Sequence, residues 1–305
     1  MTNGHSTDTV ALVAKKTKQL LDDLSRRGRY GVDTGDLGFT GTPGVVFTPR
    51  GAISACPVVV FAHDWRTKPG AYTDTFKHLA SWGFVVVAPS SSSGLFANSA
   101  KFAGQVSKAL DIILGARLGE GLVSAHRKRI GLVGHGMGGG VVTLLASMRT
   151  DITGVATLFP SPVQPEASER SPLIDARGLI LSAEDGDYVD EAVAVASTWR
   201  GDSVYRRLDK VTEHGLVETG SLLAKFGLPG PDRKTQRAVR PLLTGWLLAA
   251  IDGNPDFDAF LDPEEKIKGT KSVSQDELIE ELAQKAGEAE GGSSPANLAK
   301  TLIKG

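Results

Sequence analysis

The segment Gly134-His135-Gly136-Met137-Gly138 has the spacing of a turn that carries a catalytic nucleophile. It follows the apolar run 129–134 and opens a helical pattern at 137–148. In such a strand–turn–helix frame the outer glycines allow close packing, and the middle residue projects its side chain above the sheet from a strained turn. The helix N-terminus stabilises negative charge beside that side chain. The middle residue here is Gly136, which has no side chain and cannot attack a substrate.

Further polar side chains follow other strand-like runs and could supply a base and an acid. The carboxyl ends of parallel strands meet at one edge of a sheet, where functional residues collect. We therefore expect these side chains to lie near Gly136. His214 is the candidate base, with Asp187 as the first candidate for its acid partner and Asp185 as the second. Four further residues at these strand ends are candidates for contact with a ligand: His63, Asp64, Trp65 and His135.

In their order along the chain, these motifs resemble the α/β-hydrolase superfamily, in particular the dienelactone-hydrolase-like and polyester-hydrolase-like esterases. The resemblance covers about residues 41–263 and rests on TGTPGVVFTP, PVVVFAHDW, LASWGFVVVAP, GHGMGGG, LILSAEDGDYV and TEHG. It implies the chain order nucleophile, acid, histidine, with Gly136 at the first position, Asp187 or Asp185 at the second and His214 at the third. It also implies that the backbone N–H groups of Met137 and Trp65 form an oxyanion hole.

The chain departs from these esterases at two positions. Gly136 replaces the nucleophilic serine or cysteine. The loop after the run 57–62 reads His63-Asp64-Trp65, where the family usually has His-Gly-x. Asp64 brings a carboxylate near the place where an oxyanion would develop, which opposes the stabilisation that acyl transfer needs. Both departures act against ordinary ester hydrolysis.

Each candidate residue also has a structural interpretation. His63 and His135 are expected to be structural histidines at strand ends. A metal site formed with Asp64 and His214 is a weaker alternative, because no local pair such as His-x-x-x-His supports it. Asp185 and Asp187 could instead cap the following helix.

His214 and Gly136 leave further alternatives open. His214 is interpreted as a relic or ligand-contacting histidine, as an active base in altered chemistry, or as a plain loop residue. Glycine at position 136 has two explanations: the nucleophile was lost naturally, or it was removed deliberately. Natural loss is favoured, because alanine is the commoner engineered choice.

Strand-like and helix-like segments alternate along most of the chain. This pattern predicts an α/β fold, a mostly parallel central sheet with helices on both faces. We expect an N-terminal helical extension at 1–28, an α/β-hydrolase domain at 29–261, and a flexible charged tail with a short helix at 262–305. The strand-like runs are 44–49, 57–62, 84–89, 129–134, 154–159, 178–183 and 204–208, and the helical patterns are 7–27, 72–82, 98–118, 137–148, 188–199 and 234–251.

Composition excludes several classes of function. The 305 residues include 34 Lys and Arg against 35 Asp and Glu, so the net charge of −1 offers no general attraction to nucleic acid. The single Cys56 cannot form an internal disulfide, and the N-terminus lacks the pattern of a signal peptide. The longest apolar run is too short to span a bilayer. We expect a cytoplasmic protein with no cofactor and no metal.

The leading functional hypothesis is a pseudo-enzyme that binds a small ester-like ligand or a protein partner. The alternative is an esterase-class hydrolase with altered chemistry, such as water activated by His214 together with Asp187 or Asp185. A third hypothesis is a scaffold that recruits a protein partner through its N-terminal helix or C-terminal tail.

Overall fold

The computed structural model describes residues 17–52, 55–65, 67–91, 98–119, 121–219 and 230–292. Within these residues, ten strands form one sheet in the order β1-β2-β4-β3-β6-β7-β8-β9-β10, and β5 pairs with β6 beside this path. The strands are β1 Gly31–Asp36, β2 Gly44–Arg50, β3 Ala55–Ala62, β4 Val85–Pro89, β5 Arg117–Leu118, β6 Val123–His135, β7 Gly154–Leu158, β8 Arg177–Ala183, β9 Ser203–Leu208 and β10 Thr270–Ser272.

The middle of the sheet is parallel, as the sequence predicts. Strands β4, β3, β6, β7, β8 and β9 all run in one direction, while β1, β2 and β10 add antiparallel pairs at the two sides. The central strands read as nearly continuous apolar runs because helices cover both of their faces. The register places Ala62 beside Gly134 at the carboxyl ends of β3 and β6. The loops after these two strands therefore start next to each other.

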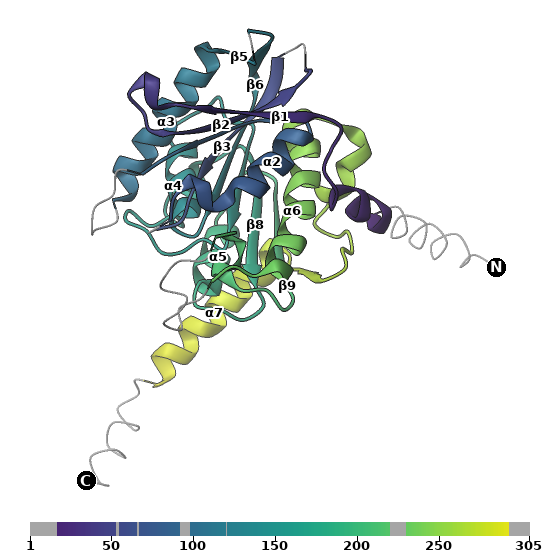
Figure 1. The fold of residues 1–305 in the computed structure, drawn as a ribbon. Helices are drawn as coiled ribbons and strands as arrows, with labels where there is room; N and C mark the ends of the chain where they lie inside the picture. The colour runs from purple at the N-terminus through teal and green to yellow at the C-terminus, as the bar shows by residue number, and fades with distance from the viewer. Residues whose placement is uncertain are drawn as a thin grey trace, which may run out of the picture.

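Helices pack on both faces of the sheet and enclose two separate hydrophobic cores (Figure 1). Helices α3, α4, α5 and α7 contribute to one core, and α2, α6 and the helical residues 17–24 contribute to the other. This arrangement confirms the predicted α/β class. The helices are α2 Thr73–Ser81, α3 Ser99–Gly115, α4 Met137–Ala146, α5 Val189–Ser197, α6 Arg233–Leu247 and α7 Gln275–Gly292.

Some boundaries differ from the sequence-based expectation. Helix α3 ends at Gly115 because Ala116 adopts an extended conformation, and residues 117–118 pair with β6 instead of continuing the helix. Helix α6 ends at Leu247, and a π-helical turn follows at Leu248–Asp252. Of the predicted helix at 7–27, residues 7–16 lie outside the described part of the chain.

The segment after residue 262 contributes to the core. Strand β10 pairs with β9, and α7 packs against α5 with the Leu278 side chain almost fully buried. The guanidinium of Arg207 in β9 forms an ion pair with Glu281 at 2.5 Å. The boundary at 261/262 stays a prediction, but part of the predicted tail adds a strand and a helix to the domain. No helix in the described part of the chain combines the length and apolar character needed to cross a membrane.

Candidate functional site

Gly136 forms the sharp turn between β6 and α4, with φ of 56° and ψ of −123°. This backbone conformation favours glycine. The neighbouring glycines are required for a different reason, close packing. A Cβ atom on Gly134 would lie under 3.0 Å from the carbonyl oxygen of Gly138, and one on Gly138 would meet the carbonyl oxygen of Ala62 equally closely. The G-x-G-x-G spacing therefore reflects contacts between β3, β6 and α4.

The carboxylate of Asp64 occupies the space above Gly136. Its Oδ1 accepts a hydrogen bond from the N–H of Met137 at 2.9 Å and another from the N–H of Trp65 at 2.7 Å. These are the two amides that the sequence analysis assigned to an oxyanion hole. The pair converges on one acceptor, as such a hole requires, but the acceptor is a side chain of the protein itself.

The absent side chain of Gly136 and the position of Asp64 are sterically linked. A Cβ atom built on Gly136 would lie closer than 3.0 Å to the carboxylate carbon and to both carboxylate oxygens of Asp64. Real Cβ atoms essentially never approach other atoms so closely. The carboxylate therefore fits in this place only because residue 136 is glycine.

His214 faces the same carboxylate from the 3₁₀ turn Glu213–Leu216. Its Nδ1 lies 3.6 Å from Oδ2 of Asp64, and about a third of the side chain is exposed. The ring of Tyr188 contacts it edge-on, with 5.6 Å between ring centroids. The structure thus brings His214, Asp64 and Gly136 together. The carboxylate beside His214 is that of Asp64, whereas the sequence predicted Asp187 or Asp185 there.

The two partners shift each other's protonation. The interaction with Asp64 raises the pKa of His214 above its ordinary value, against the opposing effect of partial burial, and the charges of Glu213 and Asp187 add to the rise. Burial raises the pKa of Asp64, but His214 and the two backbone amides outweigh it, so the net pKa is lowered. An ionised Asp64 beside a protonated His214 is the favoured state at mildly acidic pH.

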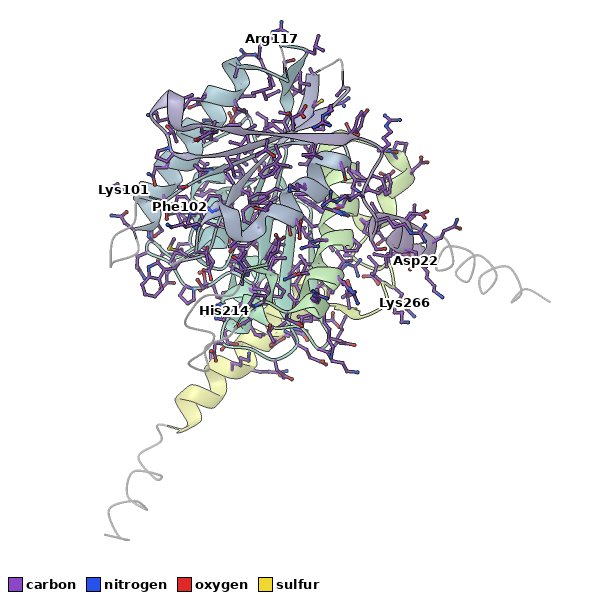
Figure 2. The ribbon with its side chains drawn as sticks, viewed as in Figure 1. Asp22, Lys101, Phe102, Arg117, His214 and Lys266 are labelled. Carbon is purple, nitrogen blue, oxygen red and sulfur yellow. The ribbon has the colours of Figure 1, made fainter. Side chains whose placement is uncertain are left out.

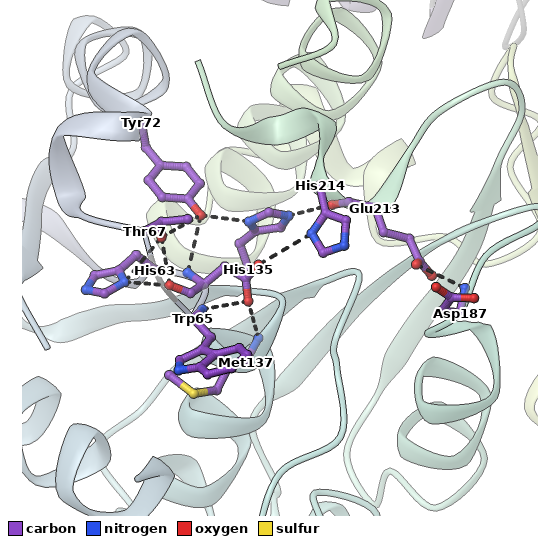
Figure 3. Close-up of polar contacts among 10 residues, drawn as sticks. His63, Trp65, Thr67, Tyr72, His135, Met137, Asp187, Glu213 and His214 are labelled. Atoms are coloured by element: carbon purple, nitrogen blue, oxygen red, sulfur yellow. Dashed lines mark hydrogen bonds and ion pairs between the residues drawn. The ribbon is translucent and has the colours of Figure 1, made fainter. Parts of the chain in front are cut away.

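A buried chain of hydrogen bonds fixes the backbone of Asp64 relative to the His214 turn (Figure 3). The N–H of Asp64 donates to the hydroxyl of Tyr72 at 3.2 Å, and this hydroxyl contacts Nδ1 of His135 at 2.8 Å. Nε2 of His135 contacts the carbonyl of Glu213 at 2.7 Å. A carbonyl can only accept, so Nε2 carries the proton and Nδ1 accepts from Tyr72. Burial lowers the pKa of His135, which keeps the ring neutral.

His63 holds the other side of the loop. Its Nδ1 donates to the carbonyl of Asp64 at 2.9 Å, and its Nε2 accepts from the N–H of Ser91 at 3.0 Å. Both nitrogens of His63 and both of His135 are therefore used in hydrogen bonds to the protein. Among the described residues, no group of three or more histidine, cysteine, aspartate or glutamate side chains could hold a metal ion.

The carboxylates of the predicted acid residues lie outside this hydrogen-bond network. Asp185 and Asp187 are exposed in the loop before α5. Neither caps α5 with its side chain; the carboxylate of Glu213 instead accepts from the N–H groups of Asp187 at 3.1 Å and Tyr188 at 2.7 Å. In the described contacts, Asp187 acts on His214 only through its charge.

A second carboxylate anchors the far end of the His214 turn. Glu218 accepts from the N–H groups of Asp74 at 2.6 Å and Thr75 at 2.7 Å, at the start of α2, and forms an ion pair with Arg240 of α6 at 2.8 Å. The segment 213–218 is thus tied to α5 at one end and to α2 and α6 at the other. Such anchoring restricts the position of His214.

Tyr72, Glu213 and Glu218 belong to the site but were not predicted from the sequence. Glu213 and His214 are neighbours in the TEHG motif, so proximity could have drawn attention to Glu213. Tyr72 and Glu218 had no such signal, because they reach the site from segments distant in sequence.

Space for a small molecule borders the site. A hollow of about 460 Å³ is lined by Met137 together with residues at the start of α3 and in the loop after β7. Larger hollows lie elsewhere, and the 940 Å³ one is lined by residues that include Arg117. Arg117 and His214 lie at opposite ends of the molecule (Figure 2). We place the functional site around Asp64, which hydrogen-bonds to Met137 at the edge of the 460 Å³ hollow; neither Asp64 nor His214 lines this hollow.

Comparison with known proteins agrees with this architecture. The Chlorophyllase family model matches residues 32–163, which include Asp64 and Gly136 but end before His214. A search of the curated proteins finds no match. The sheet order, the turn at Gly136 and this match together identify the fold as an α/β-hydrolase fold, similar over residues 32–163 to the Chlorophyllase family.

Proposed function

We propose that this protein is a pseudo-esterase, a hydrolase scaffold that binds a small ligand in its cleft and does not hydrolyse esters by acyl transfer. One observation carries the proposal: the carboxylate of Asp64 accepts hydrogen bonds from both backbone amides that were predicted to form an oxyanion hole. A substrate carbonyl would have to displace a buried, ion-paired carboxylate to reach these amides. Gly136 supplies no nucleophile even if the carbonyl reached them.

Other features favour a ligand beside this turn. His214 lies on a turn that is anchored to α5 at one end and to α2 and α6 at the other, its ring is partly exposed, and a hollow borders Met137. A small neutral ester or a molecule of similar shape is therefore the expected ligand. The water-activating alternative with Asp187 or Asp185 lacks support, because both carboxylates are exposed and neither hydrogen-bonds to His214 among the described contacts.

The scaffold alternative has no supporting observation in the described residues. Leu278, on the apolar side of α7, packs against the protein's own core and is therefore not available to a partner. Ile279 is half exposed, but a single exposed apolar side chain is ordinary. A protein partner at either terminus stays a prediction.

The test uses the full-length protein and p-nitrophenyl acetate. We expect the protein to show no His214-dependent hydrolysis above the rate in buffer alone. A kcat above about 1 s⁻¹, an ordinary enzyme value, that disappears in His214→Ala would overturn the proposal. Binding is tested separately with ethyl butyrate, which should raise the melting temperature in a concentration-dependent way while remaining unhydrolysed.

A further inference from the structure

Arg206 is a buried arginine whose guanidinium hydrogen-bonds to neutral groups. Strand β9 places it on the same face as Val204 and Leu208, which belong to a hydrophobic core. The residue is only 2% exposed. Its Nη1 donates to the carbonyl of Glu265 and its Nη2 to the carbonyl of Asp262, both at 2.9 Å. These bonds attach the loop after residue 261 to the sheet, but the carbonyls carry no negative charge.

The positive charge of Arg206 is compensated only in part. No described carboxylate forms an ion pair with it. Burial lowers the pKa of Arg206 to about 10, although the charges of Glu265 and Asp262 oppose the decrease. The side chain therefore remains charged at neutral pH. A buried charge without a paired counter-ion is unfavourable, so an anion beside this guanidinium would be stabilised.

Arg206 lines a hollow of about 680 Å³ between the helical residues 17–21 and the loop 263–274. Four lysines line the same hollow: Lys18, Lys266, Lys268 and Lys271. All four are exposed, and none forms an ion pair with a carboxylate in the described part of the chain. The carboxylates of the lining are those of Glu264, Glu265 and Glu277. The positive charges of the lining therefore exceed the negative ones.

Two of these carboxylates already bind groups of the protein. Glu277 accepts hydrogen bonds from the N–H of Ser274 at 2.8 Å and from its hydroxyl at 2.9 Å, at the start of α7. Glu265 accepts from the hydroxyl of Thr17 at 2.6 Å, which joins the helical residues 17–21 to the loop. These bonds hold the walls of the hollow in place and leave the lysine charges available to a ligand.

We propose that this hollow binds a small molecule that carries a diphosphate group. The oxygens of a diphosphate are spread widely enough to contact Arg206 and more than one lysine, whereas a single phosphate would fill only a small part of the hollow. Arginine binds phosphate oxygens through paired N–H donors, and lysine binds them as a point charge. Leu21, Pro263 and Ile267 add an apolar part to the lining, which suits the organic group of a diphosphate ester. Free pyrophosphate and a diphosphate ester share the recognised group.

This site is separate from the turn at Gly136. Lys266 and His214 lie well apart in Figure 2, and no residue of the hollow takes part in the hydrogen bonds around Asp64. The proposal therefore does not depend on the pseudo-esterase assignment, and failure of one leaves the other intact. Most of the hollow is formed by the segment after residue 262, which thereby gains a role besides packing.

Calorimetric titration of the full-length protein with ADP, at low ionic strength and without divalent cations, measures the binding. We expect a triple variant of the hollow, Lys266→Gln, Lys268→Gln and Lys271→Gln, to bind ADP about tenfold more weakly, because three charges near the phosphates are removed. A control triple variant changes the net charge equally at exposed lysines elsewhere: Lys101→Gln, Lys108→Gln and Lys128→Gln. This control should bind ADP as the wild type does. Glu264→Gln removes a negative charge from the hollow and should tighten binding about twofold.

Arg206→Met separates ligand binding from a purely structural role. We expect the folded variant to lose ADP binding; if it does not fold, the lysine variants and Glu264→Gln decide the outcome. Titrations with inorganic pyrophosphate and with adenosine identify the recognised group. Equal affinity for pyrophosphate and ADP supports a free diphosphate, and tighter binding of ADP supports a diphosphate ester. The proposal is overturned if the wild type binds neither compound, if adenosine binds as tightly as ADP, if both triple variants weaken binding equally, or if folded Arg206→Met binds ADP normally.

Discussion

Restoring a serine at residue 136 should fail unless Asp64 is changed as well. The Cβ atom of Gly136→Ser would lie under 3.0 Å from the carboxylate carbon and both oxygens of Asp64. The carboxylate would have to leave the two amides and lose both of their hydrogen bonds. Serine would also adopt the positive φ of 56° that glycine tolerates.

The destabilisation can be divided into parts. Backbone strain at a positive φ costs about 1–3 kcal/mol. Each hydrogen bond to a charged group contributes about 1.5–3 kcal/mol, so loss of the bonds from Trp65 and Met137 adds about 3–6 kcal/mol. Asp64→Ala alone loses the same two bonds. The double variant loses them only once, so its cost should fall below the sum of the single variants by about 3–6 kcal/mol.

Urea denaturation of the wild type, both single variants and the double variant measures this coupling. Gly136→Ala serves as a milder variant with the same Cβ contact if the serine variant does not fold. We also expect only the double variant to gain hydrolysis of p-nitrophenyl acetate that is lost on further His214→Ala. Additive costs within about 0.5 kcal/mol, the usual scatter for independent sites, would refute the steric link between residues 64 and 136.

Two further predictions concern the ion pair and the C-terminal helix. In a pH titration followed by NMR, His214 should titrate above its ordinary 6.5, and Asp64→Asn should move its pKa downward. The raised pKa of His214 contributes its full stabilisation below pH 6.5, and this is lost as the pH rises through the folded-state pKa of His214. The lowered pKa of Asp64 contributes stabilisation above pH 3.8, and this is lost as the pH falls through the folded-state pKa of Asp64. The difference in melting temperature between the wild type and Asp64→Asn should therefore be largest between pH 3.8 and pH 6.5. If this difference stayed constant up to pH 9, the ion pair would be contradicted. Leu278→Ala should destabilise the whole domain by about 2–5 kcal/mol, as for buried leucines in general, and the exposed Ile279→Ala by less than about 0.5 kcal/mol; equal effects in urea denaturation would show that α7 does not belong to the domain.

The fold was predictable because its signals are local. Strands β3, β4 and β6 contain apolar runs whose length and β-branched composition mark buried parallel strands, and Gly134, Gly136 and Gly138 mark the turn into α4. The contribution of the segment 270–282 was not predictable in the same way. A three-residue strand carries too little pattern, and the surface that buries Leu278 exists only after α5 has packed on the sheet.

Residue type and spacing alone show that residue 136 carries no nucleophile and that a carboxylate stands where the esterases have a glycine, because a strand–turn–helix frame can be read from the order of the residues. The role of that carboxylate follows only from the three-dimensional arrangement around it. The side-chain direction of Asp64 depends on Tyr72, which binds its backbone N–H, on the amides of Trp65 and Met137, and on the absence of a side chain at Gly136. The same arrangement makes His214 face Asp64 and leaves the carboxylate of Asp187 without a hydrogen bond to His214. The reason is that Glu213 and Glu218 anchor the His214 turn to helices that are distant in sequence.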